Sequence, residues 1–307
     1  MQIPLCLVTG FLGSGKTTFL KKILELLADS KKIGIVQNEF AGASIDGKDL
    51  RSTGKPFEII EINKGSVFCV CLLSDFVSSL TAFADSYKPD MLFIEASGLA
   101  DPIAIAELML MPEMQERFYL EHIWCVLDAS IFPKLIVYNK NATRKIRIAD
   151  TVFINKTDKI GTDTSEIRKK VALINRFATI VETQYCNATL EEIFTHNDIR
   201  IAISQAEENK QFTPSGRTEI VTGVIRSNLK ISFEGLSKFI DEIAPQVYRM
   251  KGFVNILYGN AVNIQSCFGE TRIMHENNYY DSTELIALSE SLDPRVFSQT
   301  FRKYAKS

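Results

Sequence analysis

The sequence predicts an α/β fold in which a mostly parallel sheet is flanked by helices and followed by a smaller α+β domain. Short apolar runs alternate with helical patterns up to residue 183. A polar stretch at residues 206–217, with Pro214 and Gly216, then interrupts this alternation and predicts a linker. The 307 residues suffice for one large and one small domain. We expect these domains at residues 1–207 and 216–307.

The first domain is predicted to begin with a buried strand, IPLCLVTG, at residues 3–10. Residues 16–28 follow it with apolar side chains at helical spacing, which predicts an amphipathic helix. The remaining runs predict strands at residues 31–38, 57–62, 90–97, 122–130, 150–156 and 178–183, and helices at residues 75–87 and 165–177. Strands and helices that alternate in this way indicate a mostly parallel sheet covered on both faces.

The second domain is predicted from shorter elements. Apolar runs at residues 218–227, 235–244, 246–259, 260–269 and 270–276 indicate a small α+β unit, and residues 293–307 predict a final helix. We find no internal repeat or low-complexity segment in the chain.

Composition restricts the class of protein. Hydrophobic residues make up 46% and charged residues 23%, which is typical of soluble globular proteins. The net charge of −2 gives no reason to expect a nucleic-acid partner. The N-terminus lacks signal-peptide features and no apolar run has the length of a membrane span, so we expect a cytoplasmic protein without a membrane partner. The six cysteines are scattered, which argues against a disulfide framework, and Cys6 and Cys125 lie in apolar runs that predict buried thiols.

A phosphate-binding loop is predicted at residues 10–17, GFLGSGKT, which fit the pattern G-x-x-x-x-G-K-[ST] between a strand and a helix. Glycines let backbone N–H groups close around phosphate oxygens, and the helix N-terminus adds positive potential. Lys16 would neutralise the β- and γ-phosphates, and the Thr17 hydroxyl would bind Mg²⁺. The fold is therefore predicted to be that of a P-loop NTPase. The residues expected to contact the nucleotide here are Gly10, Gly13, Ser14, Gly15, Lys16, Thr17 and Thr18.

A second nucleotide motif is predicted at FIEASG, residues 93–98, where an apolar strand ends in an acid. P-loop enzymes keep the carboxylate that holds Mg²⁺, directly or through water, at this place. Glu95 is the candidate, and Gly98 is expected to offer its N–H to the γ-phosphate. An acid at a strand end is common, so this motif gains its meaning from the phosphate-binding loop.

A base-selecting motif is predicted at residues 155–158, NKTD, which also follow a strand. The carboxylate of Asp158 can accept hydrogen bonds from both guanine N1–H and N2–H₂, whereas adenine offers no such donor pair. Asn155 can contact the guanine edge, and the stem of Lys156 can cover the ring. The motif thus predicts GTP rather than ATP; the alternative is a polar turn that caps the following segment.

Together with NEFAGASID (residues 38–46) and EASGLADP (residues 95–102), these motifs resemble the CobW-like family of P-loop GTPases. This family is related to the GTPases that insert nickel into hydrogenase and urease. The resemblance covers most of residues 1–185 and extends weakly to the end through RMKGFVNI, residues 249–256. It implies a metallochaperone or metal-cofactor assembly factor whose GTP state controls metal delivery to a client metalloprotein. It also implies that residues 38–46 are switch I and residues 95–102 are switch II.

The expected reaction is Mg²⁺-dependent hydrolysis of GTP to GDP and phosphate. Positioning and charge neutralisation by Lys16, backbone amides and Mg²⁺ would supply most of the catalysis. Glu39 and Asp46, both in the expected switch I, are the candidates for orienting the attacking water. Loss of the γ-phosphate would release the two switches.

A soft-metal site is predicted at Cys69 and Cys71, which form a Cys-x-Cys pair. Family members usually carry Cys-x-Cys-Cys, but Leu72 stands at the third position, and Gln37 precedes Asn38 in a region where many members place acids. Two thiolates are a poor cage for Zn²⁺, which prefers four ligands. Two protomers meeting at this loop would supply four thiolates for Zn, Co or Ni in a metal- or nucleotide-dependent homodimer; otherwise Glu39, Glu61 or a client would complete the site. The alternative is two small residues packing a turn.

Three functions remain open on these observations. The first is a metallochaperone GTPase. The second is a GTPase chaperone for a metal- or corrinoid-dependent enzyme that does not itself carry metal. The third is an interaction module with a decayed nucleotide site, against which the intact nucleotide motifs argue. Stimulation of GTP hydrolysis by metal would separate the first function from the second.

Overall fold

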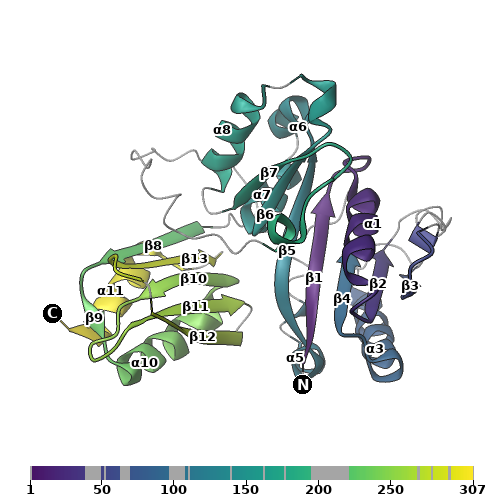
Figure 1. Ribbon diagram of the computed structural model, residues 1–307. Helices are drawn as coiled ribbons and strands as arrows, with labels where there is room; N and C mark the ends of the chain where they lie inside the picture. The colour runs from purple at the N-terminus through teal and green to yellow at the C-terminus, as the bar shows by residue number, and fades with distance from the viewer. Residues whose placement is uncertain are drawn as a thin grey trace. The chain divides into compact units, whose positions relative to one another are not determined.

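The computed structural model contains two compact units, Met1–Asp198 and Ile199–Ser307, each built on its own sheet (Figure 1). The structure describes residues 2–38, 50–51, 53–62, 70–96, 108–109, 111–138, 140–161, 163–175, 178–194, 221–267, 270–277, 279–289 and 292–306. The linker expected at residues 206–217, and with it the exact domain boundaries, lies outside the described residues.

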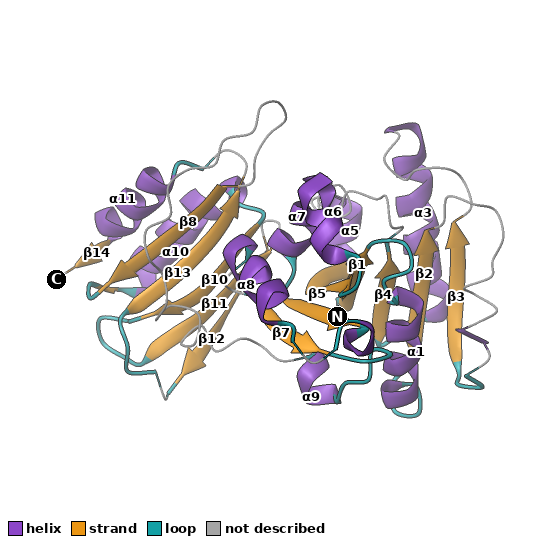
Figure 2. Cartoon of the chain, turned by 90° about the horizontal axis from the view of Figure 1, so that it is seen from above, coloured by secondary structure: helices purple, strands orange, loops and turns teal. Residues whose placement is uncertain are grey.

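The first unit contains a seven-stranded sheet with the order β3-β2-β4-β1-β5-β6-β7. Every pair of neighbouring strands is parallel, so the predicted fold class is confirmed. The strands are β1 (Ile3–Gly10), β2 (Ile33–Asn38), β3 (Phe57–Ile62), β4 (Met91–Glu95), β5 (Phe118–Asp128), β6 (Thr151–Asn155) and β7 (Thr179–Glu182). Because all strands run the same way, their carboxyl ends meet at one edge of the sheet, where the phosphate-binding loop begins (Figure 2).

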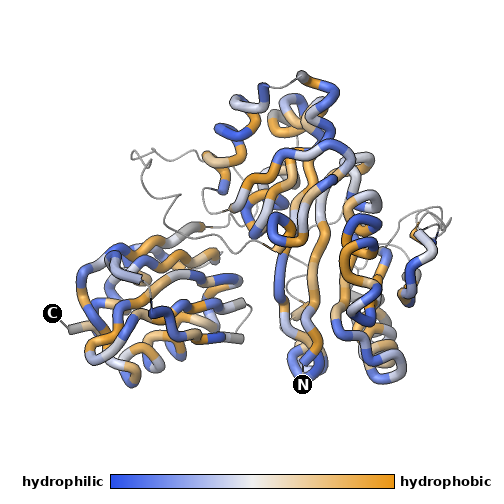
Figure 3. Tube along the Cα trace, viewed as in Figure 1, coloured by the Kyte–Doolittle hydropathy of each residue, from blue (hydrophilic) through white to orange (hydrophobic). Residues whose placement is uncertain are grey.

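Helices cover both faces of this sheet (Figure 2). They are α1 (Lys16–Leu27), α3 (Val70–Tyr87), α5 (Pro112–Arg117), α6 (Phe132–Tyr138), α7 (Lys140–Ile148), α8 (Ser165–Ile174), α9 (Leu190–Ile193) and the 3₁₀ turn η1 (Thr157–Lys159). Successive residues of β5 enter different cores: Trp124 packs with Phe19 of α1, whereas Cys125 packs with Ile146 of α7. The central strands are therefore hydrophobic along much of their length (Figure 3).

Some expected elements have different bounds in the structure. The helix expected at residues 75–87 begins earlier, at Val70, because the apolar run at its start hides the helical period. The strand expected at residues 122–130 is β5, which begins at Phe118. Helices α6 and α7 were not expected from the sequence pattern. The buried thiols expected at Cys6 and Cys125 are confirmed, since both side chains are fully enclosed.

The second unit contains a five-stranded antiparallel sheet with the order β12-β11-β10-β13-β8. Its strands are β8 (Val221–Ser227), β10 (Arg249–Val254), β11 (Ala261–Cys267), β12 (Glu270–Glu276) and β13 (Thr283–Ser289), beside a short pair of β9 (Lys230–Ile231) and β14 (Ala305–Lys306). Helices α10 (Phe233–Ile243) and α11 (Pro294–Tyr304) share one hydrophobic core with this sheet, and a 3₁₀ turn, η3 (Ala244–Gln246), follows α10. The expected α+β character of this unit is confirmed.

Candidate functional site

The phosphate-binding loop joins the end of β1 to the start of α1. Gly10 and Gly15 have φ angles of 149° and 110°, which side chains rarely allow. A Cβ atom on Gly10 would lie 2.3 Å from the carbonyl oxygen of Val126, and one on Gly15 would lie 2.5 Å from the amide nitrogen of Asn155. Glycine is therefore required at both positions, because any larger residue would prevent the loop from packing this closely against Val126 and Asn155.

Inside this loop, the Ser14 hydroxyl is fully buried and has no hydrogen-bond partner within the described parts of the chain. Leaving a buried hydroxyl unpaired costs about 1–3 kcal/mol. The ammonium of Lys16 donates to the carbonyl oxygen of Phe11 over 3.1 Å. An anion in the loop would offer an acceptor to both side chains, so these two features fit a phosphate group.

Glu95 lies at the end of β4, beside β1, and the structure brings it to the phosphate-binding loop. The hydroxyl of Thr17 donates to one carboxylate oxygen of Glu95 over 3.2 Å, as expected for two groups that share a Mg²⁺ ion. The amide of Gln37 donates to the other oxygen over 2.9 Å, and the side chains of Gln37 and Glu95 are both buried. A hydroxyl and a carboxylate are hard oxygen donors, so this set fits Mg²⁺ rather than a soft metal.

Asn155 joins the NKTD segment to the phosphate-binding loop. Its side-chain nitrogen donates to the carbonyl oxygen of Ser14 over 3.0 Å. Its side-chain oxygen accepts from the backbone N–H of Cys186 over 2.9 Å and from the hydroxyl of Thr183 over 3.2 Å. The residue is 2% exposed. Its amide thus ties together three segments that follow β1, β6 and β7; a contact between Asn155 and guanine stays a prediction.

Lys156, the second residue of NKTD, has a left-handed backbone with φ of 62°. Its ammonium donates to the carbonyl oxygen of Gly13 and, over 2.7 Å, to the carboxylate of Asp128 at the end of β5. Burial acts to raise the pKa of Asp128, but hydrogen bonds from Lys156 and Ser130 outweigh burial and hold this pKa below its usual value. The ion pair fixes the lysine stem beside the loop, where we expected it to cover a base.

Asp158 lies on η1 and is exposed. It lines a cavity of about 460 Å³ together with Thr183 and Gln184, which follow β7. Its carboxylate makes no hydrogen bond or ion pair with any residue that the structure describes. The carboxylate is thus available to a ligand, as a base-selecting group must be.

Sequence reasoning did not assign a role to Gln37, Asp128 or Cys186. Cys186 contacts the phosphate-binding loop directly, because its thiol donates to the carbonyl oxygen of Gly15 over 3.4 Å. Burial raises the pKa of this thiol to about 12, so it stays protonated at neutral pH. The available signal was position: each of the three residues lies in the last two residues of a strand of the parallel sheet, or a few residues beyond it.

The structure leaves part of the expected site undescribed. Glu39, Asp46, Cys69 and Gly98 lie outside the described residues, and of Cys71 only the backbone is described. Within the described residues, no group of three His, Cys, Asp or Glu side chains could hold a metal ion. The cysteine site therefore stays a prediction.

The comparisons with known proteins agree with this geometry. Residues 4–182 match the CobW/HypB/UreG nucleotide-binding domain. The chain belongs to this family. Among its relatives is the zinc chaperone CobW of Sinorhizobium sp, which is 33% identical over 134 residues that cover 42% of this chain and 37% of that protein. The zinc chaperone YjiA of Escherichia coli is 25% identical over 266 residues, covering 82% of this chain and 81% of that protein.

A third relative of this CobW/HypB/UreG-family chain is the zinc-regulated GTPase metalloprotein activator 1 of Saccharomyces cerevisiae, 27% identical over 66% of this chain and 53% of that protein. The match to CobW spans well under half of that protein's length. The crystal structure of Zn(II)-bound YjiA GTPase from E. coli superposes with a TM-score of 0.64 at 20% identity and covers 100% of both chains, which shows the same fold.

No described helix is long and apolar enough to cross a bilayer.

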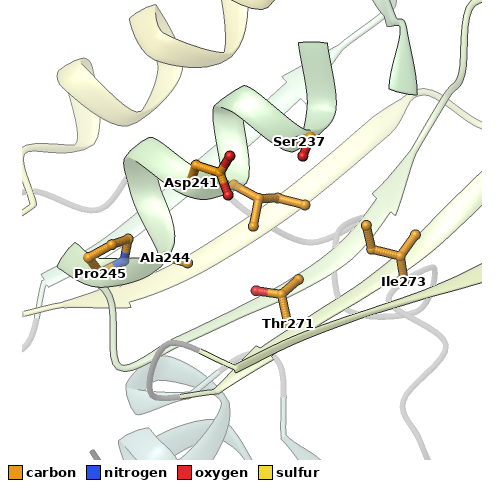
Figure 4. Close-up of a pocket in the computed structure, with 7 residues that line it drawn as sticks. Ser237, Asp241, Ala244, Pro245, Thr271 and Ile273 are labelled. Carbon is orange, nitrogen blue, oxygen red and sulfur yellow. The ribbon is translucent and has the colours of Figure 1, made fainter. Parts of the chain in front are cut away.

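A second hollow, of about 400 Å³, lies in the C-terminal unit between α10 and the edge strand β12 (Figure 4). Ser237 and Asp241 of α10 and Ala244 of η3 lie opposite Thr271 and Ile273 of β12 across it. Among the described residues that line it, Asp241 is the one ionisable side chain. The described residues around this hollow offer no set of groups for catalysis. The nucleotide site, where the three motifs meet, is the candidate functional site.

Proposed function

We propose that this chain is a Mg²⁺-dependent GTPase of the metallochaperone type, which hydrolyses GTP to GDP and phosphate and couples its nucleotide state to metal delivery or to assembly of a metal-dependent enzyme. The observation that carries this proposal is the joining of the three nucleotide motifs. Thr17 bonds to Glu95, and Asn155 bonds to the carbonyl of Ser14. The groups expected for the phosphates, the cation and the base thus converge on one edge of the sheet.

Each group has a role that follows from its chemistry. Backbone amides of residues 10–18 and the ammonium of Lys16 would bind phosphate oxygens. Thr17 and Glu95 would hold Mg²⁺, which when bound neutralises charge on the β- and γ-phosphates. Asp158 would accept the two guanine donors. Gly98, Glu39 and Asp46, the expected γ-phosphate donor and water-orienting groups, complete the proposal from outside the described residues.

The proposed metal-delivery role has its support in the relatives. CobW and YjiA carry the name zinc chaperone, and the yeast relative is named a metalloprotein activator. By analogy, the client would be a metalloprotein. Cys69 and Cys71 would bind Zn, Co or Ni, either between two protomers or with ligands from the client.

The second candidate is a GTPase chaperone that carries no metal itself. Leu72 at the expected third cysteine position favours this function. Gln37, which is bonded to Glu95 through a neutral amide, favours it too, because an amide is a weaker metal ligand than a carboxylate.

GTP hydrolysis measured with Mg²⁺ alone and with added Zn²⁺, Co²⁺ or Ni²⁺ tests both candidates, with ATP and the variant Lys16→Ala as controls. We expect Mg²⁺-dependent release of phosphate from GTP and none from ATP. Stimulation by one soft metal, with bound metal lost in the Cys69→Ser/Cys71→Ser variant, supports the metallochaperone. A rate of GTP hydrolysis that none of the three metals changes, with equal metal content in wild type and variant, supports the second candidate. Absence of GTP binding would refute both.

A further inference from the structure

Helix α7 buries a lysine, Lys145, against the phosphate-binding loop. The side chain is 0% exposed. It lies on the inward face of the helix beside Ala142 and Ile146, which are apolar core residues. Its ammonium donates to the hydroxyl of Thr9 over 3.3 Å and lies 5.7 Å from the ring centroid of Phe11. Thr9 directly precedes the loop and Phe11 is its second residue, so Lys145 contacts both sides of the loop's first turn.

Burial of an ammonium group needs compensation. Moving a charged amine out of water is strongly unfavourable unless it is solvated by protein groups. The Thr9 hydroxyl supplies one acceptor, and the face of an aromatic ring within about 6 Å of a cation attracts it further. An apolar side chain at this position would avoid the cost of burying an ammonium group. The positive charge therefore needs a functional explanation.

Lys16 and Lys145 act on the same small region. Lys16 donates to the carbonyl oxygen of Phe11, the residue whose ring faces Lys145. Cys125 pairs with Thr9 in the sheet. Burial raises the pKa of Cys125 to about 12, while Lys145 and, to a lesser extent, Lys16 act in the opposite direction. Two ammonium groups therefore lie close to the first residues of the phosphate-binding loop.

We propose that Lys145 is a second, fixed cation of the phosphate site, which strengthens nucleotide binding in proportion to the number of phosphate charges. Lys16 reaches the phosphates directly. Lys145 is enclosed, so it acts as a positioning residue: it holds Thr9 and Phe11, and it adds positive potential that needs no reorganisation when the ligand arrives. This inference rests on the proposed nucleotide site and adds a residue to it.

The test is a comparison of nucleotides that differ only in phosphate charge. Dissociation constants of GTP, GDP and GMP are measured by calorimetry for wild type, Lys145→Met, Lys145→Gln and Lys145→Arg. We expect the two neutral variants to weaken GTP binding about tenfold, GDP binding less and GMP binding least, because the interaction of charges scales with their product. Lys145→Arg, which keeps the positive charge, should retain most of the affinity for GTP that the two neutral variants lose.

A purely structural role gives a different result. Lys145→Gln keeps a polar group for Thr9, so it serves if the methionine variant does not fold. Lys134→Met removes an exposed positive charge from the neighbouring helix α6 and should leave all three affinities unchanged. Equal weakening for GTP, GDP and GMP, or none, in the neutral Lys145 variants would overturn the inference. Failure of the wild type to bind GTP would instead refute the proposed function.

Discussion

Replacing Asn155 by alanine should loosen the whole nucleotide site, because this one amide joins three segments. The substitution removes the bond to the Ser14 carbonyl and two bonds accepted from Cys186 and Thr183. Since Asn155 is 2% exposed, water cannot readily replace these bonds. The Cys186 N–H, the Ser14 carbonyl and the Thr183 hydroxyl would each lose the side chain of Asn155 as a partner.

The expected magnitude follows from these contacts. A buried polar group left unpaired costs about 1–3 kcal/mol, and three such groups are created, so we expect Asn155→Ala to lose at least about 3 kcal/mol. If most of this loss falls on the ordered, binding-competent loop, the dissociation constant for GTP rises about 100-fold. The variant Thr183→Val removes only the 3.2 Å contact and should cost about 1 kcal/mol or less.

Titration with GTP and chemical unfolding, carried out on the same preparations, measure the two effects. Asn155→Asp serves as a third variant, because it keeps the acceptor for Cys186 and Thr183 but replaces the donor to Ser14 with an oxygen. We expect it to bind GTP more weakly than Thr183→Val. If Asn155→Ala binds GTP within threefold of the wild type, Asn155 does not hold the phosphate-binding loop, and this explanation of the site is refuted.

Three further predictions concern the base, the cation and pH. Asp158→Asn should lose GTP affinity but gain affinity for xanthosine triphosphate, whose 2-oxo group accepts from the new amide; equal loss of both in competition binding would exclude Asp158 as the base selector. Gln37→Met should raise the Mg²⁺ concentration for half-maximal hydrolysis several-fold, because Glu95 loses a hydrogen bond at 2.9 Å; an unchanged Mg²⁺ titration with only a lower melting temperature would contradict this. The pKa of Asp128 is lowered in the folded state, so its pair with Lys156 should stabilise the protein at neutral pH and lose this effect as pH falls below about 4. Urea unfolding should therefore show Asp128→Asn less stable than wild type at pH 7, with the difference shrinking in acid; a constant difference would refute the pairing.

The parallel sheet was predictable because its strands are buried on both faces and read as apolar runs. That the motif residues lie together was predictable because each motif follows a strand of the parallel sheet, whereas the roles expected for them with phosphate, Mg²⁺ and guanine stay predictions. Helix α7 was not, and the reason is Lys145: a lysine on the inward face breaks the apolar period that would have revealed the helix. The residue that hid the helix is thus also the one proposed to add positive charge to the site.

The hydrogen bonds between the motifs could not be predicted from the sequence either. Residues 155–158 predict a base-binding segment, but nothing in that pattern says that the amide of Asn155 faces Ser14 and Cys186, which lie far from it in the chain. Such contacts depend on strand order. They arise because β1 and β6 flank β5 in the sheet while β7 follows β6 at its edge, an order that a single sequence leaves open.

Gln37 lies between the candidate nucleotide site and the expected switch I. It is the last but one residue of β2, and residues 38–46, the expected switch I, begin immediately after it. Its amide bonds to the carboxylate that also accepts from Thr17. A shift of Glu95 on cation binding would therefore act on the start of that segment through this buried hydrogen bond. The two hydrogen bonds of Glu95, from Thr17 and from Gln37, do not involve Cys69 or Cys71, so this coupling does not depend on metal binding by the two cysteines.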